Sequence, residues 1–419
     1  MAEDLIELAD RMWRGEADVP GLITVSNELT EVADDVAFVW SMANVSAFAT
    51  DAGLVLIDTG SAFMAGNIHQ AVRGWTQDPL HTAVYSHGHI DHVFGVRRFE
   101  DEGPRARVVA HEAMPARFDR YVLTNGYNSI INERQFGLPN VPWPKSYRYP
   151  DETYRDLLTL EVGGETFELH HARGETDDHT WTWIPNRKVL CTGDFFIWAS
   201  PNAGNPQKVQ RYPREWAVAL QEMAALGAEV LLPGHGVPIF GAERIREALT
   251  DTAELLQSIH DQTVALMNDG ASLDTILRTV KMPRELLEKP YLRPTYDDPE
   301  FIVHNVWRQY GGWWDGDPAT LKPAPNADLA AELAQLTGGA DKLAGRAREL
   351  ADEGRLRLAG HLAEFAALAS EEEHATRAEI NERRAQQESS VMAKGIFGSA
   401  ARESRARGQS PGARPSESQ

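Results

Sequence analysis

Short apolar runs rich in β-branched residues alternate with polar or glycine-containing breaks along the first part of the chain. Four such runs lie at residues 22–25, 36–40, 54–57 and 82–86. Runs of this length between breaks predict buried strands. Helical spacing over residues 63–75 predicts a helix ahead of the last of these strands. Strands and helices that alternate in this way indicate a layered α/β fold.

The pattern becomes helical beyond Ile245. Apolar residues recur at three- to five-residue intervals from Ile245 to Met267, and Gly270 provides a stop. Further helices are expected at residues 273–280, 328–336, 341–352, 356–369 and 371–392. The aromatic-rich residues 113–150 show no strand pattern. They are expected to form either an irregular insertion or a helical flap beside a substrate pocket.

These changes in pattern divide the 419 residues into four expected parts. Residues 1–20 are expected to form an N-terminal extension, residues 21–243 an α/β domain and residues 244–394 an all-α domain. Residues 395–419 are rich in Gly, Ser, Arg, Ala and Pro and are expected to form a disordered tail.

Composition narrows the expected partners and compartment. With 41 basic and 62 acidic residues the formal charge is −21. This argues against nucleic acid, which is bound through clustered Lys and Arg. The single cysteine, Cys191, is expected to be a buried thiol, and it excludes an intramolecular disulfide. No signal-peptide pattern and no run of about 18 apolar residues is visible, so we expect a cytoplasmic protein without a membrane span.

Metal-binding residue types concentrate directly after the strand at residues 82–86. His87, His89, Asp91 and His92 form the pattern HxHxDH. Imidazole nitrogen and carboxylate oxygen are the ligands that hold zinc and similar divalent ions. Because these residues follow a buried strand, we expect them on a loop at the strand's end, where α/β folds often place functional groups.

This pattern resembles the signature of the metallo-β-lactamase superfamily, and the Gly-His235-Gly sequence resembles its final motif. The resemblance implies an αββα sandwich with a dinuclear centre. Three ligands are implied for each metal, with Asp194 shared between them: His87, His89 and Glu175 for the first, and Asp91, His92 and His235 for the second. Glu175 stands where the family usually has histidine, 19 positions before Asp194, and His179 is the rival for that place. Asp58, in an Asp-Thr-Gly turn, is expected to brace the loop.

A second resemblance is to the alkyl sulfatases. It rests on Glu175, on Leu190-Cys191 before the shared carboxylate, on Asn202, and on residues 304–318. Residues 259–270 resemble the start of the helical dimerisation domain of that family, which implies a homodimer. Two positions depart from the family: Gln207 stands where it has arginine, and Asp194 where it has glutamate.

Two bound divalent ions would lower the pKa of a bridging water and supply hydroxide, which Asp91 is expected to orient. We therefore predict a dinuclear metal-dependent hydrolase of an alkyl sulfate or related ester with an apolar portion. The metal is expected to be Zn²⁺, with Mn²⁺ or Fe²⁺ as alternatives. A hydrolase of a lactone, thioester or carboxylic ester is the alternative within the fold, and a non-catalytic metal-binding scaffold is the alternative outside it.

Residues expected to contact the substrate are Asn202, Lys208, Arg211, Tyr127 and His179. Three carboxylates among the ligands bring a dinuclear site close to neutrality. An anionic ester would therefore need nearby cations, for which Lys208 and Arg211 are the candidates.

Overall fold

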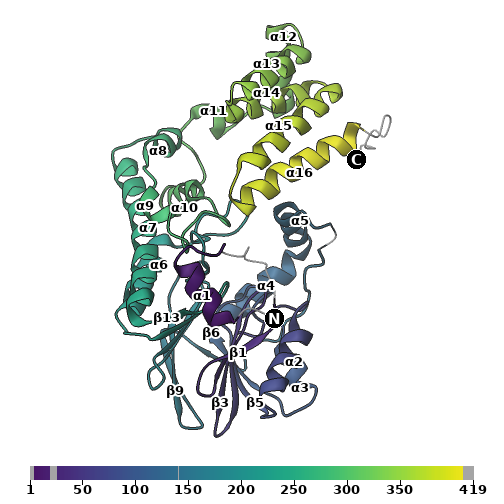
Figure 1. Cartoon of the computed structure of the whole chain (residues 1–419). Helices are drawn as coiled ribbons and strands as arrows, with labels where there is room; N and C mark the ends of the chain where they lie inside the picture. Colours follow the sequence, from purple (N-terminus) through teal and green to yellow (C-terminus); the bar gives the residue numbers. More distant parts are fainter. Residues whose placement is uncertain (1–3, 19–25, 140, 409–419) are drawn as a thin grey trace. The chain divides into compact units, whose positions relative to one another are not determined.

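The apolar runs form strands in two sheets of the computed structural model, which describes residues 4–18, 26–139 and 141–408 (Figure 1). The predicted strand at residues 22–25 lies outside this part of the chain. The other three runs are confirmed as strands: β2 (Val36–Val39), β4 (Gly53–Ile57) and β5 (Leu80–Val84). The helix predicted between them is also confirmed, as α2 (Ala65–Trp75).

The first sheet has seven strands in chain order, β1 to β7. Strands β1 to β4 are antiparallel neighbours, and β4 to β7 are parallel. The remaining strands of this sheet are β1 (Leu29–Ala33), β3 (Val45–Thr50), β6 (Arg107–His111) and β7 (Glu152–Tyr154).

The second sheet has six strands in the order β13-β12-β11-β10-β9-β8. All neighbours are antiparallel except β11 and β12. Its strands are β8 (Leu157–Val162), β9 (Glu165–His171), β10 (Thr180–Ile184), β11 (Val189–Gly193), β12 (Val230–Pro233) and β13 (Ile239–Phe240).

Side-chain alternation along the strands builds the layers. Phe38 belongs to a core shared with the second sheet, whereas its neighbour Ala37 belongs to a core shared with α2. Phe48 of β3 meets Phe167 of β9 edge to face, with ring centroids 5.3 Å apart.

Helices α2, α3 (Val96–Glu100) and α4 (Met114–Leu123) cover the outer face of the first sheet. Helices α6 (Pro213–Ala224) and α7 (Ala242–Asn268) pack on the second. The predicted αββα sandwich is confirmed.

The described residues divide into two compact units. The first comprises those up to Asn125 together with Trp143–Trp313, and the second comprises Gly126–Pro142 together with those from Trp314 onward. The first unit also holds α1 (Leu5–Trp13), α8 (Leu273–Thr279), α9 (Arg284–Leu287) and α10 (Pro299–Gly311).

This division differs from the expected boundary after residue 243. Helix α7 packs with the sheets because Leu249 and Leu256 enter the same core as Leu231 of β12. Leu5 and Met12 bring α1, in the expected N-terminal extension, into that core as well. The boundaries 1–20, 21–243 and 244–394 describe domains rather than packing units and stay a prediction.

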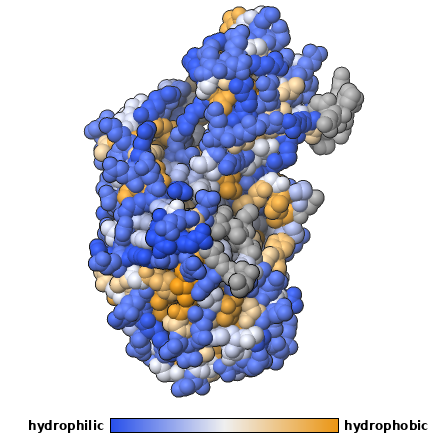
Figure 2. Space-filling view, viewed as in Figure 1, coloured by the Kyte–Doolittle hydropathy of each residue, from blue (hydrophilic) through white to orange (hydrophobic). Residues whose placement is uncertain are grey.

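The second unit is entirely helical in its described residues. Its elements are α5 (Asn125–Phe136, all but its first residue), α11 (Pro318–Leu321), α12 (Asn326–Thr337), α13 (Ala340–Asp352), α14 (Leu356–Ala369), the 3₁₀ turn Glu371–Glu373, α15 (His374–Gln387) and α16 (Val391–Gly408). The helices predicted at residues 328–336, 341–352 and 356–369 are confirmed, whereas the one predicted at 371–392 is divided into the 3₁₀ turn, α15 and the start of α16. Ile130 on α5 and Leu138 after it are exposed, and Figure 2 shows a hydrophobic patch over this helix.

The disordered tail expected from residue 395 is wrong as far as Gly408, because α16 continues to that residue. Its small residues pack closely instead of forming a flexible segment. A Cβ on Gly395 would lie 1.9 Å from the carbonyl oxygen of Gln135 on α5. Arg377 of α15 donates to the carbonyl of Ala400 at 2.9 Å. The rest of the expected tail, residues 409–419, lies outside the described residues.

Of the two expectations for residues 113–150, the helical one is correct for its first part, which forms α4 and α5. Whether this segment acts as a flap beside a substrate pocket stays a prediction. No helix in the described part of the chain combines the length and apolar character needed to cross a bilayer.

Asn44 joins the two sheets at the end where the histidines gather. Its backbone N–H donates to Gly234 at 2.8 Å, and its side-chain amide donates to the carbonyls of Pro233 and Gly236 at 3.0 and 2.9 Å. Its Oδ1 accepts from the N–H of Ser41 at 3.1 Å. The side chain is buried, so these backbone groups depend on it for hydrogen bonds.

We expect Asn44→Ala to lower the free energy of unfolding by about 2–4 kcal/mol, because each buried group left without a partner costs about 1–3 kcal/mol. Urea unfolding followed by tryptophan fluorescence would measure it. Asn268→Ala, at an exposed helix end, is the matched control and should change stability by less than about 0.5 kcal/mol. Equal effects of the two substitutions would show that Asn44 does not join the sheets.

Candidate metal centre

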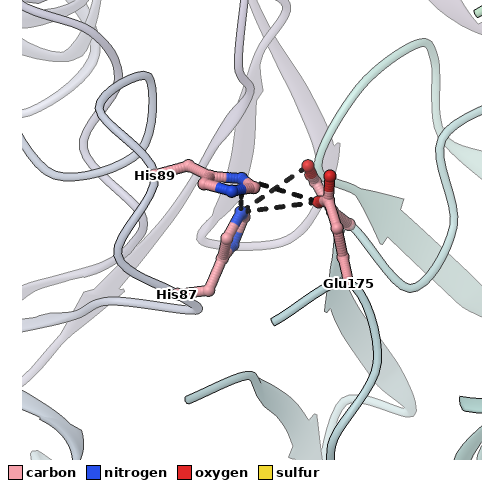
Figure 3. Close-up of side chains that lie close together, drawn as sticks. His87, His89 and Glu175 are labelled. Carbon is pink, nitrogen blue, oxygen red and sulfur yellow. Dashed lines mark hydrogen bonds and ion pairs between the residues drawn. The ribbon is translucent and has the colours of Figure 1, made fainter. Parts of the chain in front are cut away.

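Seven His, Asp and Glu side chains, all residue types that can bind metal, converge at the ends of strands from both sheets. His87, His89, Asp91 and His92 lie on the loop after β5, as the sequence predicts. Glu175 precedes β10, Asp194 follows β11 and His235 follows β12. Figure 3 shows His87 and His89 facing Glu175, which comes from a different stretch of chain.

These side chains form two adjoining groups. In each group, every residue offers one ligand atom within 4.8 Å of the others. The first group is His87, His89, Glu175 and Asp194, and the second is Asp91, His92 and His235. They are the two ligand sets implied by the sequence resemblance, with Asp194 placed in the first.

Asp194 lies between the groups. Its Oδ2 is 3.7 Å from His87 Nε2 and 3.4 Å from His235 Nε2, and its Oδ1 is 3.4 Å from His92 Nε2. This position between the two groups is the one expected for a shared carboxylate. Gly234 makes it possible, since a Cβ there would lie 2.1 Å from Asp194 Oδ1.

The buried atoms that face the centre fit a bound metal. His92 Nε2, Glu175 Oε2 and Asp194 Oδ1 are buried and have no hydrogen-bond partner. Buried polar atoms are normally paired, and imidazole nitrogen and carboxylate oxygen in such a cluster are the donors that divalent transition ions prefer. The cluster is therefore able to hold metal.

The outward-facing nitrogens of the histidines are held by the protein. His92 Nδ1 donates to Asp58 Oδ2 at 2.8 Å, and His235 Nδ1 donates to the carbonyl of Met42. His87 Nδ1 donates to Ser86 Oγ at 3.0 Å, whose hydroxyl in turn donates to Asp58. In these three histidines the contacts place the proton on Nδ1, so that Nε2 carries the lone pair that can bind a metal ion. Asp58 thus braces the loop, as expected.

Charge and burial bias the two buried carboxylates in opposite directions. Burial raises the pKa of Glu175 well above its usual value, although Arg211 acts against this rise. Burial also acts to raise the pKa of Asp194, but His235, His92 and His87 outweigh it and hold that pKa well below the usual range. These directions hold without a bound metal ion, and metal binding would require both carboxylates to be ionised.

His179, the rival of Glu175, lies behind the centre. It is fully buried, its ring stacks on that of His87 with centroids 4.4 Å apart, and its Nε2 accepts the backbone N–H of Asp194 at 3.2 Å. Burial lowers its pKa to about 3. A neutral imidazole that accepts a hydrogen bond through Nε2 supports the ligand loop rather than completing either group.

The other residues expected to contact the substrate lie in different environments. Asn202 and Arg211 are buried and bind Glu175. Lys208 is half-buried, with its ammonium 5.6 Å from the ring centroid of Trp143. Tyr127 is 60% exposed and belongs to the second unit.

Sequence reasoning missed a buried ion pair beneath the loop. Asp178 accepts the N–H of Gly88 at 3.0 Å and pairs with Arg117 Nε at 2.8 Å. The guanidinium comes from α4, and no local pattern links it to a residue 61 positions further on. The only indication in the sequence is that Asp178 lies three positions after Glu175, close to the predicted ligands.

Comparison with known families matches two models to separate parts of the chain. Residues 39–235 match the metallo-beta-lactamase superfamily, and residues 272–407 match the alkyl sulfatase dimerisation family. The first range contains all seven clustered side chains.

Similar proteins of known name support the same assignment. A linear primary-alkylsulfatase from Pseudomonas sp. is 30% identical over 321 residues, which cover 70% of this chain and 60% of the relative. An (R)-specific secondary-alkylsulfatase from Pseudomonas sp. is 27% identical, with 87% of this chain and 60% of the relative covered. The chain thus spans about three-fifths of the length of these relatives.

A solved structure shares the fold. The stereoselective inverting sec-alkylsulfatase Pisa1 from Pseudomonas sp. matches with a TM-score of 0.81 at 23% identity, covering 96% of this chain and 70% of that one. Together, the matched models, the relatives and the clustered side chains lead to one conclusion: the chain belongs to the metallo-β-lactamase superfamily, in the alkyl-sulfatase-like group that carries the alkyl sulfatase dimerisation region.

Proposed function

We propose that this chain is a dinuclear metal-dependent hydrolase that cleaves the sulfate ester of an apolar alcohol. The observation that carries the proposal is the convergence of four imidazoles and three carboxylates in two adjoining groups. The names of the similar proteins, which are alkylsulfatases, favour a sulfate ester as the substrate.

His87, His89 and Glu175 would hold one ion, Asp91, His92 and His235 the other, and Asp194 both. Bound there, two divalent ions would lower the pKa of a shared water and supply hydroxide at neutral pH. Four imidazoles in the donor set favour Zn²⁺, with Mn²⁺ or Fe²⁺ as alternatives.

Asp91 is the carboxylate with the best access to a reacting water. Its side chain is 27% exposed, compared with 2% for Glu175 and 7% for Asp194. It lies 3.6 Å from His235 Nε2 and 3.7 Å from His92 Nε2. We assign it the role of accepting a hydrogen bond from the attacking water and so fixing its direction.

Lys208 is the cation proposed to bind the sulfate group. Burial and the neighbouring Arg211 lower its pKa to about 7, while the charges of Glu175 and Asp91 act to raise it. The influence of Glu175 and Asp91 on Lys208 supports this role. Trp143, beside Lys208, would offer an apolar surface to the alcohol portion.

A homodimer is part of the proposal. It rests on the dimerisation region at residues 272–407 and on exposed apolar side chains of the second unit, such as Leu321, Leu329 and Leu336. The cytoplasmic location expected from the sequence stays a prediction.

The first test is release of inorganic sulfate from octyl, decyl and dodecyl sulfates by the zinc-loaded chain, beside carboxylic esters, thioesters and lactones of similar length. We expect sulfate release. Turnover of another ester without sulfate release would show that the chain hydrolyses that ester instead. Gln207 and Asp194 favour this alternative, because both depart from the alkyl sulfatase pattern. Bound metal without turnover of any ester would indicate a scaffold.

Asp91→Ala should remove one of two bound zinc ions and lower kcat by more than about 100-fold, since losing a ligand should exceed the 10- to 100-fold effect of losing an outer partner. Elemental analysis of the dialysed protein and initial rates would measure this. Asp101→Ala, at an exposed position, should retain both ions. Wild-type turnover in the Asp91 variant would contradict the dinuclear centre.

Lys208→Met should raise KM for an alkyl sulfate by roughly 10- to 100-fold, since hydrogen bonds to charged groups contribute about 1.5–3 kcal/mol. KM for any neutral ester that is cleaved should change little, because no anion is lost there. Steady-state kinetics with both substrates, and Lys322→Met as an exposed control, would separate the two effects. An unchanged KM for the sulfate would remove Lys208 from the anion site.

A further inference from the structure

Glu175 occupies the place where the superfamily usually has a neutral histidine, so a buried carboxylate must be accommodated there. Its side chain is 2% exposed. A carboxylate removed from water needs a charged or strongly donating partner, because burying it alone is costly.

Arg211 provides that partner. Its side chain is also only 2% exposed, and its Nη1 lies 3.0 Å from Glu175 Oε1. The same nitrogen donates to the backbone carbonyl of Glu175. One guanidinium therefore contacts both the main chain and the side chain of a single residue, which fixes the position of that residue.

The second donor to Glu175 acts on the same oxygen. Asn202 Nδ2 donates to Oε1. Oε2 is left without a hydrogen-bond partner and lies 3.7 Å from His87 Nε2 and 3.6 Å from His89 Nδ1 (Figure 3). The two oxygens are thus differentiated: Oε1 is held by the protein, and Oε2 faces the metal position.

Arg211 is itself held by α10. Asn305 Nδ2 donates to the carbonyl of Arg211 at 2.9 Å, and the N–H of Arg211 donates to Asn305 Oδ1 at 3.3 Å. The next residue, Tyr212, donates its N–H to the carbonyl of Gly174 at 3.0 Å. The segment that carries Arg211 is therefore fixed both to α10 and to the loop that carries Glu175.

These contacts change the charge count at the centre. The carboxylate of Glu175 and the guanidinium of Arg211 together carry no net charge, as a neutral histidine would. Three carboxylates among the ligands were expected to weaken the attraction for an anionic ester. The positive charge of Arg211, which contacts the ligand Glu175, offsets this effect.

We propose that Arg211, together with Asn202, is a positioning residue for the metal centre, and that the Glu175–Arg211 pair replaces the usual histidine as one unit. Arg211 then serves the ligand and not the substrate, in contrast to the role expected from the sequence. The inference rests on the proposed dinuclear centre, but it does not depend on which ester is cleaved.

The test is a double-mutant cycle of Arg211→Met and Glu175→His, read out as Zn²⁺ affinity by competition with a chromophoric chelator. Arg211→Met should lower the affinity for one of the two zinc ions by about 10- to 100-fold, the usual effect of losing a residue that supports a metal ligand. Glu175→His alone should also weaken it, because Arg211 is left buried without its anion. The double variant should recover affinity to within a few-fold of wild type.

Three further variants sharpen the cycle. Arg211→Lys keeps the charge and should weaken zinc less than Arg211→Met, and it tests the pair if the methionine variant does not fold. Asn202→Ala should lower the affinity for the same zinc ion. Arg187→Met breaks an ion pair with Glu165, the first residue of β9, at the end of the strands opposite to the metal centre. It is the matched control and should leave the binding of both ions unchanged. Circular dichroism would verify the fold of each.

Two outcomes would overturn this inference alone. Additive losses in the double variant would show that Arg211 does not act through Glu175. Unchanged zinc affinity in Arg211→Met with a raised KM for alkyl sulfate would show that Arg211 binds the substrate. Failure of the proposed function looks different, since a cycle with strong coupling but no ester turnover would leave the pair intact and remove only the hydrolase assignment. A wild-type chain without bound zinc would overturn both.

Discussion

The constraint on which this structure depends is the gathering of three carboxylates and four imidazoles, most of them buried, in one place. Such a cluster is unfavourable without metal, because like charges repel and buried polar atoms lack partners. The surrounding protein reduces this cost in specific ways. Asp58 orients His87 and His92, Asp178 holds the loop at Gly88, and Arg211 balances Glu175. The fold therefore holds the cluster in place with partners at its outer side.

The two sheets contribute different halves of this cluster. The loop after β5 in the first sheet supplies four side chains, and the second sheet supplies the other three. Any displacement of one sheet against the other would separate the groups. Asn44, which bonds across the sheets beside His235, resists such displacement. Gly234 also helps to keep the two groups together, since a side chain at this position would occupy the place of Asp194.

The helical part of the chain also reaches the centre. The dimerisation-family match begins at residue 272, yet α8 to α10 belong to the first unit. Through Asn305, α10 fixes the backbone of Arg211, and Arg211 fixes Glu175. The region that resembles a dimerisation domain therefore has two parts, one that packs on the sandwich and supports a ligand, and one that forms the second unit.

The sequence by itself predicted three strands of the first sheet, the long helices and the HxHxDH loop, because periodicity and short spacings are local properties of the chain. Glu175, Asp194 and His235 were predicted from the resemblance to a known family. Only the tertiary structure decided that α16 is ordered by packing against α5, and that α7 belongs with the sheets. It also decided that Arg211 faces Glu175. These outcomes depend on contacts between residues far apart in the chain, such as Arg211 with Asn305, and no local pattern encodes which distant partner a buried cation will meet.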